Sequence, residues 1–295
     1  MGNSSLNNAD AATVAGFGRE WTRFTQETLS LEERHEIFQQ YFSIFPWDIL
    51  PNDGGCGADI GCGSGRWARA VAPRVSQLHL VDASSEALQV ARANLSSSQN
   101  VSFHHASAGD LPFEKQSLDF AYSLGVLHHT PDPEGGLRAI ASALKPGAPF
   151  LLYLYYAFDN RPAWYRWLWR LSDLARRALS RQPQWLKVTM AEMVALSVYW
   201  PLARMAGLSA RLRIKIENWP LAYYRDRSLY VMRTDALDRL GTRLEQRFTR
   251  QRIAEMLERA GFEKVRFSDG PPFWCVVGLK RSEPEFSDNT VTNPT

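Results

Sequence analysis

The stretch GADIGCGSGRWARAV, residues 57–71, places Gly61, Gly63 and Gly65 between an apolar run and a helix-like run. Glycine loses more backbone freedom on folding than any other residue, so three within five positions are costly unless the turn needs them. A turn from a strand into a helix needs them when a ligand must closely approach the unpaired N–H groups of the helix. The spacing therefore indicates a ligand-binding strand–turn–helix unit.

Alternating strands and helices follow this unit. Strands are expected over 57–60, 77–83, 101–107, 117–124 and 148–156, and helices over 65–73, 84–97 and 133–144. The alternation stops at Ala157 and resumes at Phe248, with a helix over 249–262 and strands over 264–270 and 272–281. Alternation of this kind indicates βαβ units and a mainly parallel sheet. The short loop between the last two strands makes that pair antiparallel.

The remaining segments divide the chain into four parts. Residues 1–50 are expected to form an N-terminal tail and helical cap, with disorder to about residue 12 and an amphipathic helix over 29–45 that ends at Pro46. The core is expected at 51–157 and 248–281, and a helical insertion at 158–247. The polar residues 282–295 are expected to be a disordered tail.

Composition excludes several classes of protein. The chain has 295 residues, of which 45% are hydrophobic and 22% charged, and a net charge of +3, which are globular proportions. Its three cysteines, Cys56, Cys62 and Cys275, have no metal-like spacing, so we expect no metal site and no disulfide framework. With no secretory signal and no long apolar run, we expect a cytoplasmic protein.

The ligand of the glycine turn is not a dinucleotide, because G-C-G-S-G fails the G-x-G-x-x-G spacing. Asp82 lies seventeen residues beyond Gly65, at the end of the second strand, where a carboxylate can accept both hydroxyl hydrogens of a ribose. Asp59 can pair with an ammonium group. The alternatives are a plain tight turn for the glycines and a helix-capping role for Asp82.

The motifs DIGCGSG, VDAS, DLPFEKQSLDFAYSLGVLHH and LKPGAPFLLYLY resemble the class I S-adenosylmethionine-dependent methyltransferases, in the type 11-like branch that methylates small molecules. The resemblance covers residues 55–157 and 248–281. It implies an α/β fold with a Rossmann-like sheet of seven strands. The sheet is mostly parallel, and its last strand is antiparallel. N-terminal helices and a helical insertion after strand 5 complete this fold. It also implies S-adenosylmethionine as cofactor and S-adenosylhomocysteine as product.

By this resemblance, the methionine end of the cofactor would be held by Asp59 and Gly61, while Gly63 and Gly65 shape the turn. The end of the fourth strand, Ser123 and Leu124, would also face the methionine. In the element FGREWTRF, the side chains of Phe17, Trp21 and Phe24 would fold over the cofactor, or else pack the N-terminal helix on the sheet.

The same resemblance places the nucleoside. Asp82 would bind the ribose and Ala83 would lie against the adenine. Ser107 stands where the family often has an acid that bonds the adenine amino group; a neutral hydroxyl accepts that bond more weakly. A plain turn residue is the alternative for Ser107. Ala108 would offer a backbone N–H to the ring.

The candidate bases follow strands four and five. Methyl transfer needs a base only if the acceptor must lose a proton, as a hydroxyl acceptor does. His128 is the first candidate and His129 the second, because both follow the fourth strand where an α/β sheet opens its crevice. Tyr155 is a further candidate, with Tyr156 and Asp159 behind it. A structural role is the alternative for the histidine pair.

The insertion is strongly basic. Residues 157–247 contain seventeen Lys and Arg against eight Asp and Glu, and six of the ten tryptophans. Two amphipathic helical stretches are expected, the second broken at Pro201. They form a lid over the acceptor pocket, or they contact an anionic membrane surface through residues 162–206. An RNA-binding face is a third hypothesis, although the arginines follow no RNA-binding motif. Tyr223, Tyr224, Arg225, Arg227 and Asp235 resemble an acceptor-lining linker.

We therefore expect a methyltransferase of a small-molecule acceptor, an O-methyltransferase acting on a sugar, a sugar-linked intermediate or a secondary metabolite. One alternative is a peripheral-membrane methyltransferase of a lipid or quinone precursor. Another is a non-catalytic S-adenosylmethionine-binding protein that uses the insertion to dock a partner.

Overall fold

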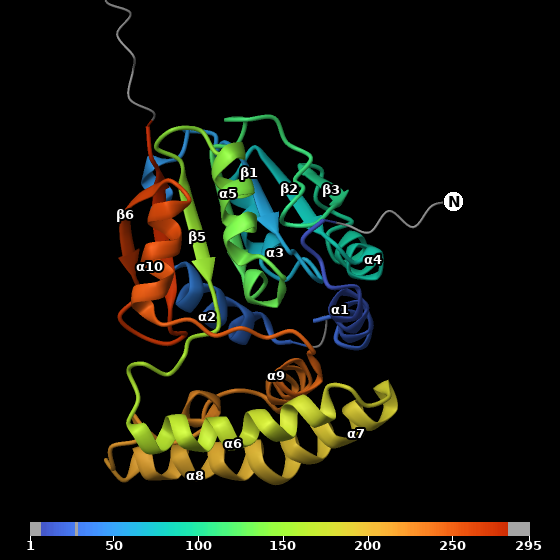
Figure 1. Ribbon diagram of the computed structural model, residues 1–295, viewed down its shortest axis with the longest axis vertical. Helices are drawn as coiled ribbons and strands as arrows, with labels where there is room; N and C mark the ends of the chain where they lie inside the picture. The colour runs from blue at the N-terminus through green and yellow to red at the C-terminus, as the bar shows by residue number, and fades with distance from the viewer. Residues whose placement is uncertain (1–6, 27–28, 283–295) are drawn as a thin grey trace, which may run out of the picture.

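A seven-stranded sheet lies at the centre of the protein, seen in a computed structural model that describes residues 7–26 and 29–282 (Figure 1). The strand order is β3-β2-β1-β4-β5-β7-β6, and β7 alone runs antiparallel to its neighbours. This confirms the expected fold. The strands are β1 (Cys56–Ile60), β2 (Gln77–Asp82), β3 (Val101–His105), β4 (Phe120–Leu124), β5 (Pro149–Tyr153), β6 (Phe262–Phe267) and β7 (Cys275–Lys280).

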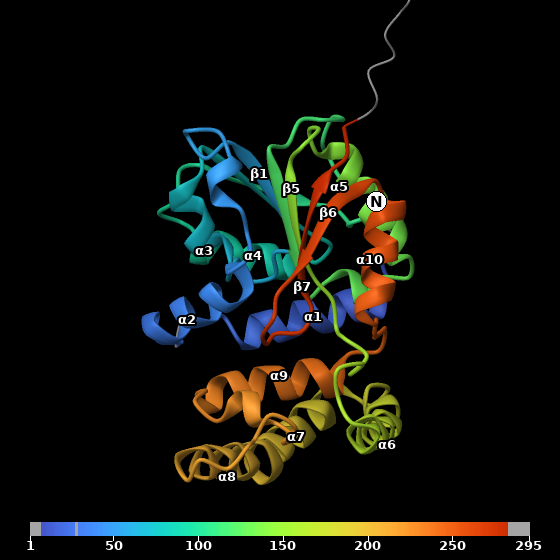
Figure 2. The ribbon, with the colours of Figure 1, turned by 90° about the vertical axis from the view of Figure 1, so that its left-hand side faces the viewer.

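The two faces of the sheet are buried in separate apolar clusters. Successive side chains of a strand point to opposite faces. Thus Phe120 and Tyr122 of β4 join the cluster beneath α2, α3 and α4, whereas Ala121 joins the cluster beneath α5 and α10. Figure 2 shows the two groups of helices on opposite sides of the sheet. Both central strands β4 and β5 are buried along their whole length, as their apolar sequences predict.

The helices against the sheet begin and end at recognisable residues. They are α2 (Leu31–Phe42), α3 (Ala68–Val71), α4 (Ser85–Asn94), α5 (Pro133–Ala143) and α10 (Arg250–Arg259). Ser84 caps α4 by accepting the N–H of Ala87. The helix expected over 65–73 is shorter, because α3 gives way to a 3₁₀ turn, Ala72–Arg74, that includes Pro73.

The N-terminal segment is ordered from residue 7. The expectation of disorder to about residue 12 is therefore wrong for residues 7–12, and residues 1–6 lie outside the described part of the chain. Asp10 accepts the N–H of Thr13 and caps helix α1 (Ala11–Arg23). The side chain of Asn8 bonds the backbone of Asp132 twice, at 2.7 Å to its N–H and 2.7 Å to its C=O. These contacts hold α1 across the carboxyl ends of the strands. The expected tail from residue 283 also lies outside the described residues.

The insertion leaves the core after β5 and returns beside its exit point. Tyr156 and Phe248 form a β-bridge where the two ends meet. Between them, α9 (Leu229–Gly241) packs against α1, and α6 (Ala163–Leu179) and α7 (Gln184–Val194) pack against α9. Figures 1 and 2 show α6, α7 and α8 as a layer on the far side of α9 from the sheet. The insertion is therefore two layers deep, with α9 innermost.

Pro201 does not break the second helical stretch, which corrects that expectation. A π-helical turn (Ala195–Tyr199) joins α7 directly to α8 (Trp200–Arg211), and Pro201 lies in the first turn of α8. Proline lacks an N–H and clashes with the carbonyl four residues earlier, and a wider π turn accommodates it without ending the helix. No helix within residues 7–26 and 29–282 is long and apolar enough to span a bilayer.

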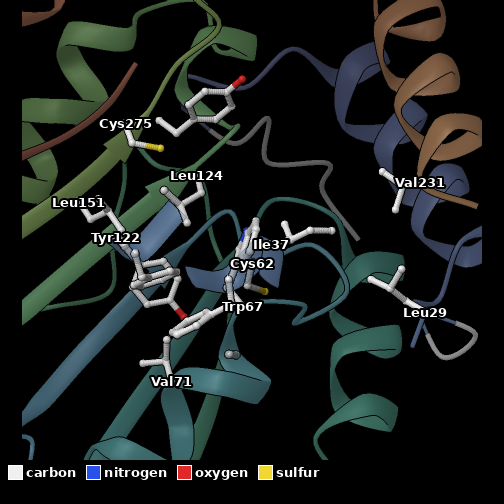
Figure 3. Packing of buried hydrophobic residues seen from close by; sticks show 14 of the residues in the cluster. Leu29, Ile37, Cys62, Trp67, Val71, Tyr122, Leu124, Leu151, Val231 and Cys275 are labelled. Atoms are coloured by element: carbon white, nitrogen blue, oxygen red, sulfur yellow. The ribbon is translucent and has the colours of Figure 1, made fainter. Parts of the chain in front are cut away.

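One apolar cluster joins the sheet to the insertion. Figure 3 shows it extending from Tyr122, Leu151 and Cys275 on the sheet to Val231 on α9. Trp67 lies in it beside the glycine turn. Because this continuous core includes α9, the inner layer of the insertion is held in place over the sheet by burial of apolar surface.

Gly57 on β1 leaves room for the Phe120 ring of the neighbouring strand, since a Cβ at this position would lie 2.2 Å from that ring. We expect Gly57→Ala to lower the free energy of unfolding by about 1–3 kcal/mol through overpacking. Gly16→Ala is the matched control, because a Cβ on this α1 residue meets nothing within 4 Å; it should raise stability by up to about 1 kcal/mol. Urea unfolding of both variants measures this. A Gly57→Ala protein as stable as the unmodified chain would contradict the packing.

Candidate functional site

A pocket opens at the carboxyl ends of β1, β2 and β4, beneath α1. Gly61, Asp82 and Leu124 line it from the strand ends, and Phe17 and Trp21 line it from α1. The volume of this cavity is about 120 Å³, whereas a single water molecule needs about 10–15 Å³. Parallel α/β sheets bind their ligands at this edge. The pocket is thus where the sequence predicts a ligand.

Asp82 organises the floor of the pocket. Its Oδ2 accepts the N–H of Gly63 at 2.8 Å, and its Oδ1 accepts the N–H of Ser84 at 2.8 Å. Burial raises the pKa of this carboxyl, while the backbone N–H groups oppose the rise. Asp82 does not cap α4, because Ser84 does. Each carboxylate oxygen has two lone pairs, so the side chain can still accept bonds from a ligand in the pocket.

The three glycines serve different purposes. Gly61, at φ +80°, lines the pocket, and a Cβ there would lie 2.4 Å from Val126. Gly63, at φ +53°, lies under the indole of Trp21, which a Cβ would meet at 2.8 Å, and its N–H bonds Asp82. Gly65 lies off the pocket and faces Leu95. Two of the glycines therefore shape the site, and the third packs the turn on α4.

Asp59 lies behind the glycine turn, 1% exposed. Its Oδ2 accepts the hydroxyl hydrogen of Tyr122 at 3.0 Å, and its Oδ1 has no hydrogen-bond partner among the described residues. Burial raises the pKa of Asp59 to about 8, against the opposing bond from Tyr122. A buried carboxyl oxygen without a partner is costly unless a donor or a cation reaches it.

The far end of the pocket is lined by Ala83, Ser107 and Ala108, and by Asn8 from the N-terminal segment. Ser107 is buried, donates its hydroxyl to the carbonyl of Asn7, and accepts the N–H of Gly109 at 3.3 Å. The sequence predicted the first three residues but not Asn8. The available signal was Asp10, a capping residue directly before an alanine-rich run.

Ser123 and Leu124 differ in their environments. Leu124 lines the pocket, whereas Ser123 is fully buried and donates its hydroxyl to the carbonyl of Ile60 at 2.9 Å. Ser123 therefore ties β4 to β1. Residues that line the pocket and that the sequence did not single out are Asn8, Ala9, Asp10, Thr13, Val14, Ser84, Ala106, Gly125, Val126 and Thr130.

Trp21 and Phe17 lie over the pocket, where the sequence expected them to fold over a cofactor or to pack the N-terminal helix on the sheet. Both line it, and the Phe17 ring is centred 5.0 Å from the His129 ring. Phe24 does not line the pocket: it is buried in the apolar core, edge-on to Tyr230 of α9.

His128 lies outside the lining of the pocket. It is fully buried, its Nδ1 accepts the N–H of Tyr155 at 3.4 Å, and its ring stacks on Tyr155 at 3.9 Å between centroids. Burial lowers the pKa of His128 well below its usual range. Tyr155 likewise does not line the pocket; its hydroxyl donates to Asp238 on α9. The geometry gives both residues packing and positioning roles.

His129, the second candidate base, does line the pocket. Its Nδ1 lies 2.7 Å from the carbonyl oxygen of Leu244, which can only accept, so Nδ1 carries the proton. The Nε2 lone pair has no hydrogen-bond partner in the described part of the chain and lies 3.9 Å from Asp238 Oδ1. Burial lowers the pKa of His129, and Asp238 opposes the decrease. Burial therefore favours the neutral imidazole, whose buried Nε2 faces Asp238.

Acidic side chains gather where α9 meets α1. Burial raises the pKa of Glu20 on α1 well above its usual range, and the charges of Asp238 and Asp235 raise it further. Asp235 accepts the hydroxyl hydrogen of Tyr224 at 2.6 Å. The inner layer of the insertion thus brings carboxyl groups and tyrosine hydroxyls to the His129 side of the pocket.

The other residues predicted on the insertion and after β5 lie elsewhere. Arg227 is buried and pairs with Glu36 of α2 at 3.0 Å, and Arg225 pairs with Asp226. Tyr223 reaches Gln40 with its hydroxyl at 3.4 Å. Asp159 accepts the N–H of Arg250 and the indole N–H of Trp274, which fixes the return of the chain into α10. Tyr156 takes part in the bridge at the base of the insertion.

Comparison with known proteins agrees with this geometry. A sequence profile described as a methyltransferase domain matches residues 58–152. The ubiquinone biosynthesis O-methyltransferase of Xanthomonas campestris pv. campestris (strain B100) is 38% identical over 96 residues, 32% of this chain and 40% of that protein. The uncharacterized methyltransferase YcgJ of Bacillus subtilis (strain 168) is 36% identical over 104 residues, 35% of this chain and 41% of that protein. The chain thus spans about two fifths of the length of these curated relatives.

Solved structures share the fold over nearly the whole chain. A putative S-adenosyl-L-methionine-dependent methyltransferase from Methanococcus maripaludis aligns with a TM-score of 0.52 at 15% identity, over 95% of this chain and 99% of that one. The putative methyltransferase complexed with the Trm112 activator of Haloferax volcanii aligns with a TM-score of 0.51 at 15% identity, over 89% and 98%. At this identity the likeness concerns the fold alone.

The buried carboxyl of Asp59 generates a pH-dependent stability. Its pKa is about 8 in the folded chain, well above the ordinary carboxyl value. At a pH between these two values, the folded chain therefore binds one proton more than the unfolded chain. The free energy of unfolding should therefore fall as pH rises from about 4 to 8, by at most about 1.4 kcal/mol per pH unit from this group. Asp59→Asn should remove this contribution and be more stable than the unmodified chain above pH 8. Urea unfolding across that range measures it, and parallel curves for the two proteins would refute it.

Proposed function

The chain carries a class I S-adenosylmethionine-dependent methyltransferase domain over residues 58–152, and we propose that the whole protein transfers a methyl group to a hydroxyl of a small-molecule acceptor. One observation carries the proposal: Asp82, Gly61 of the glycine turn and His129 line a single pocket. A cofactor site and a base thus share one opening.

The residues of the pocket fit the cofactor. The Oδ1 of Asp59 has no hydrogen-bond partner among the described residues, and an ammonium group that reached it would favour the charged carboxylate and lower its raised pKa. The remaining lone pairs of Asp82 suit two ribose hydroxyls. Ala83 and Ala108 offer small apolar surfaces beside Ser107 for a flat ring. These assignments rest on position and chemistry together.

His129 supplies the base that a hydroxyl acceptor requires. When bound, S-adenosylmethionine supplies a methyl group on an already activated sulfonium, so alignment provides much of the acceleration. His129 Nε2 would accept the hydroxyl proton of the acceptor, while the Leu244 carbonyl holds Nδ1–H and fixes the tautomer. The Asp238 carboxyl, 3.9 Å from Nε2, would stabilise the imidazolium that results. Tyr155 would orient Asp238 through its hydroxyl.

The transfer to oxygen is also supported by the names of the relatives, several of which are ubiquinone biosynthesis O-methyltransferases. The sequence favoured a sugar, a sugar-linked intermediate or a secondary metabolite as acceptor. The exposed apolar side chains of α6 and α8 favour the second candidate class, a lipid or quinone precursor. A non-catalytic cofactor-binding protein would have no need of the oriented, unpartnered His129.

The role of Asp82 can be tested by calorimetric titration of S-adenosylmethionine and S-adenosylhomocysteine. We expect Asp82→Ala to weaken both at least tenfold, because a hydrogen bond to a charged acceptor contributes about 1.5–3 kcal/mol. Asp82→Asn, which keeps one acceptor oxygen and the shape, should retain part of the affinity. The melting temperature of each free variant controls for collapse of the glycine turn. Unchanged affinity in Asp82→Ala would show that this carboxylate holds only the backbone.

His129→Gln should lower kcat for a hydroxyl acceptor by about 10²–10⁴-fold, as loss of a general base does, and leave S-adenosylmethionine affinity within a few-fold. Because burial lowers the pKa of His129 below 6.5, the activity of the unmodified enzyme should be level through neutral pH and fall only at acidic pH. Asp238→Asn should move that decline to still lower pH. His128→Gln is the matched control, since His128 lies outside the lining of the pocket.

Equal losses in His128→Gln and His129→Gln would contradict the assignment of the base. Absence of a methylated product from phenol, quinol and sugar acceptors alike, with S-adenosylmethionine still bound, would favour the non-catalytic alternative.

A further inference from the structure

Helix α6 buries charged side chains and exposes large apolar ones, whereas a surface helix usually does the opposite. Its buried side chains are Asp173 and Arg176, which pair at 2.7 Å, and Arg176 donates to the carbonyl of Thr242 beside the end of α9. Tyr165 and Trp169 pack on Phe158, whereas five other large apolar side chains point away from the protein at helical spacing. Trp167 is 63% exposed and Leu174 is 65% exposed. The exposed stripe consists of Trp164, Trp167, Leu168, Leu171 and Leu174.

The joined helices α7 and α8 repeat this arrangement. Their buried positions are mostly small, such as Ala191, Ala203 and Ala206, and face the rest of the protein. Large apolar side chains, among them Trp185, Leu208 and Leu212, are 59–69% exposed. Fourteen of the sixteen large apolar side chains that are exposed in the described residues belong to the insertion. We call this exposed surface of α6, α7 and α8 the outer face; Figures 1 and 2 show its helices on the far side of α9 from the sheet.

The charges around the outer face are almost all positive. Residues 161–216 contain eleven Lys and Arg and two acidic residues. Both acidic residues are neutralised by arginines: Asp173 by Arg176 and Arg177, and Glu192 by Arg23 and Arg233. On α6 the exposed Arg166, Arg170 and Arg177 lie along one flank of the apolar stripe. A ligand for this face must therefore offer an apolar interior and a negatively charged surface.

We propose that the outer face lies on an anionic membrane surface. The apolar stripes of α6 and of α7–α8 enter the boundary between headgroups and acyl chains, with tryptophans at the level of the headgroups. The flanking arginines bind the phosphates of anionic lipids. No helix of the described residues is suited to cross the bilayer, so this contact is peripheral. The inference extends beyond the proposed reaction and does not depend on it.

A second copy of the chain fits this face less well. Two copies in contact through it would bring together two surfaces of strongly positive charge, which repel each other. An anionic bilayer satisfies the apolar side chains and the arginines at once. The bilayer is therefore the occupant that the observations favour, and self-association is the alternative that the experiment must exclude.

Flotation of the full chain with lipid vesicles tests the proposal. We expect binding to vesicles of phosphatidylcholine mixed with phosphatidylglycerol, weakening with salt, and little binding to phosphatidylcholine alone. The apolar variant Trp167→Glu/Leu174→Glu and the charge variant Arg170→Glu/Arg211→Glu/Arg213→Glu should each bind at least about tenfold more weakly. Matched controls change exposed residues outside the insertion, Leu31→Glu/Ile49→Glu and Lys115→Glu/Lys264→Glu, and should bind as the unmodified chain does.

Each variant should keep its melting temperature and its affinity for S-adenosylmethionine, which separates loss of membrane binding from loss of folding or of the proposed reaction. The proposal is overturned if the chain floats with neither vesicle, or equally with both. It is also overturned if sedimentation velocity shows a dimer that Trp167→Glu/Leu174→Glu converts to a monomer, since the outer face would then be covered by a second copy.

Discussion

The two hydrogen bonds that the Asp82 carboxylate accepts hold the pocket in shape. One bond fixes the N–H of Gly63 in the glycine turn after β1, and the other fixes the N–H of Ser84 at the start of α4. Two neighbouring βα units are thereby joined at their carboxyl ends by one side chain. The positive φ angles of Gly61 and Gly63, and the approach of Trp21 to Gly63, depend on this arrangement.

Burial gives the site its unusual protonation states. Asp59 is held with a raised pKa, and His129 with a lowered one, because both lie where water cannot solvate their charged forms. A neutral histidine with one nitrogen fixed by a backbone carbonyl is suited to accept a proton. The same burial leaves the Asp59 oxygen ready for a cation. Burial thus shifts the pKa of the carboxyl upward and the pKa of the imidazole downward.

The inner layer of the insertion, α9, contacts the site. Its outer layer, α6, α7 and α8, lies on the far side of α9 (Figures 1 and 2). α9 carries Asp238 to His129 and is fastened to the sheet by the apolar core that includes Val231. The polar pair Asp173 and Arg176 fastens α6 to the inner layer, so apolar side chains of α6 are left outside. A lid that only covered an acceptor would bury those side chains rather than expose them.

The sequence by itself determined the fold, because glycine spacing, strand–helix alternation and strand hydrophobicity are local properties of the chain. It also singled out Gly61, Asp82, Ala83, Ser107, Ala108 and Leu124, which share one edge of the sheet. Only the tertiary structure distinguishes the surroundings of His128 and His129. These adjacent residues of one 3₁₀ turn differ because His128 packs against Tyr155 and His129 contacts Leu244. The tertiary structure likewise brought Asn8 to the pocket and turned the apolar stripe of α6 outward. Contacts between segments that are distant in the sequence leave no periodic signal in it.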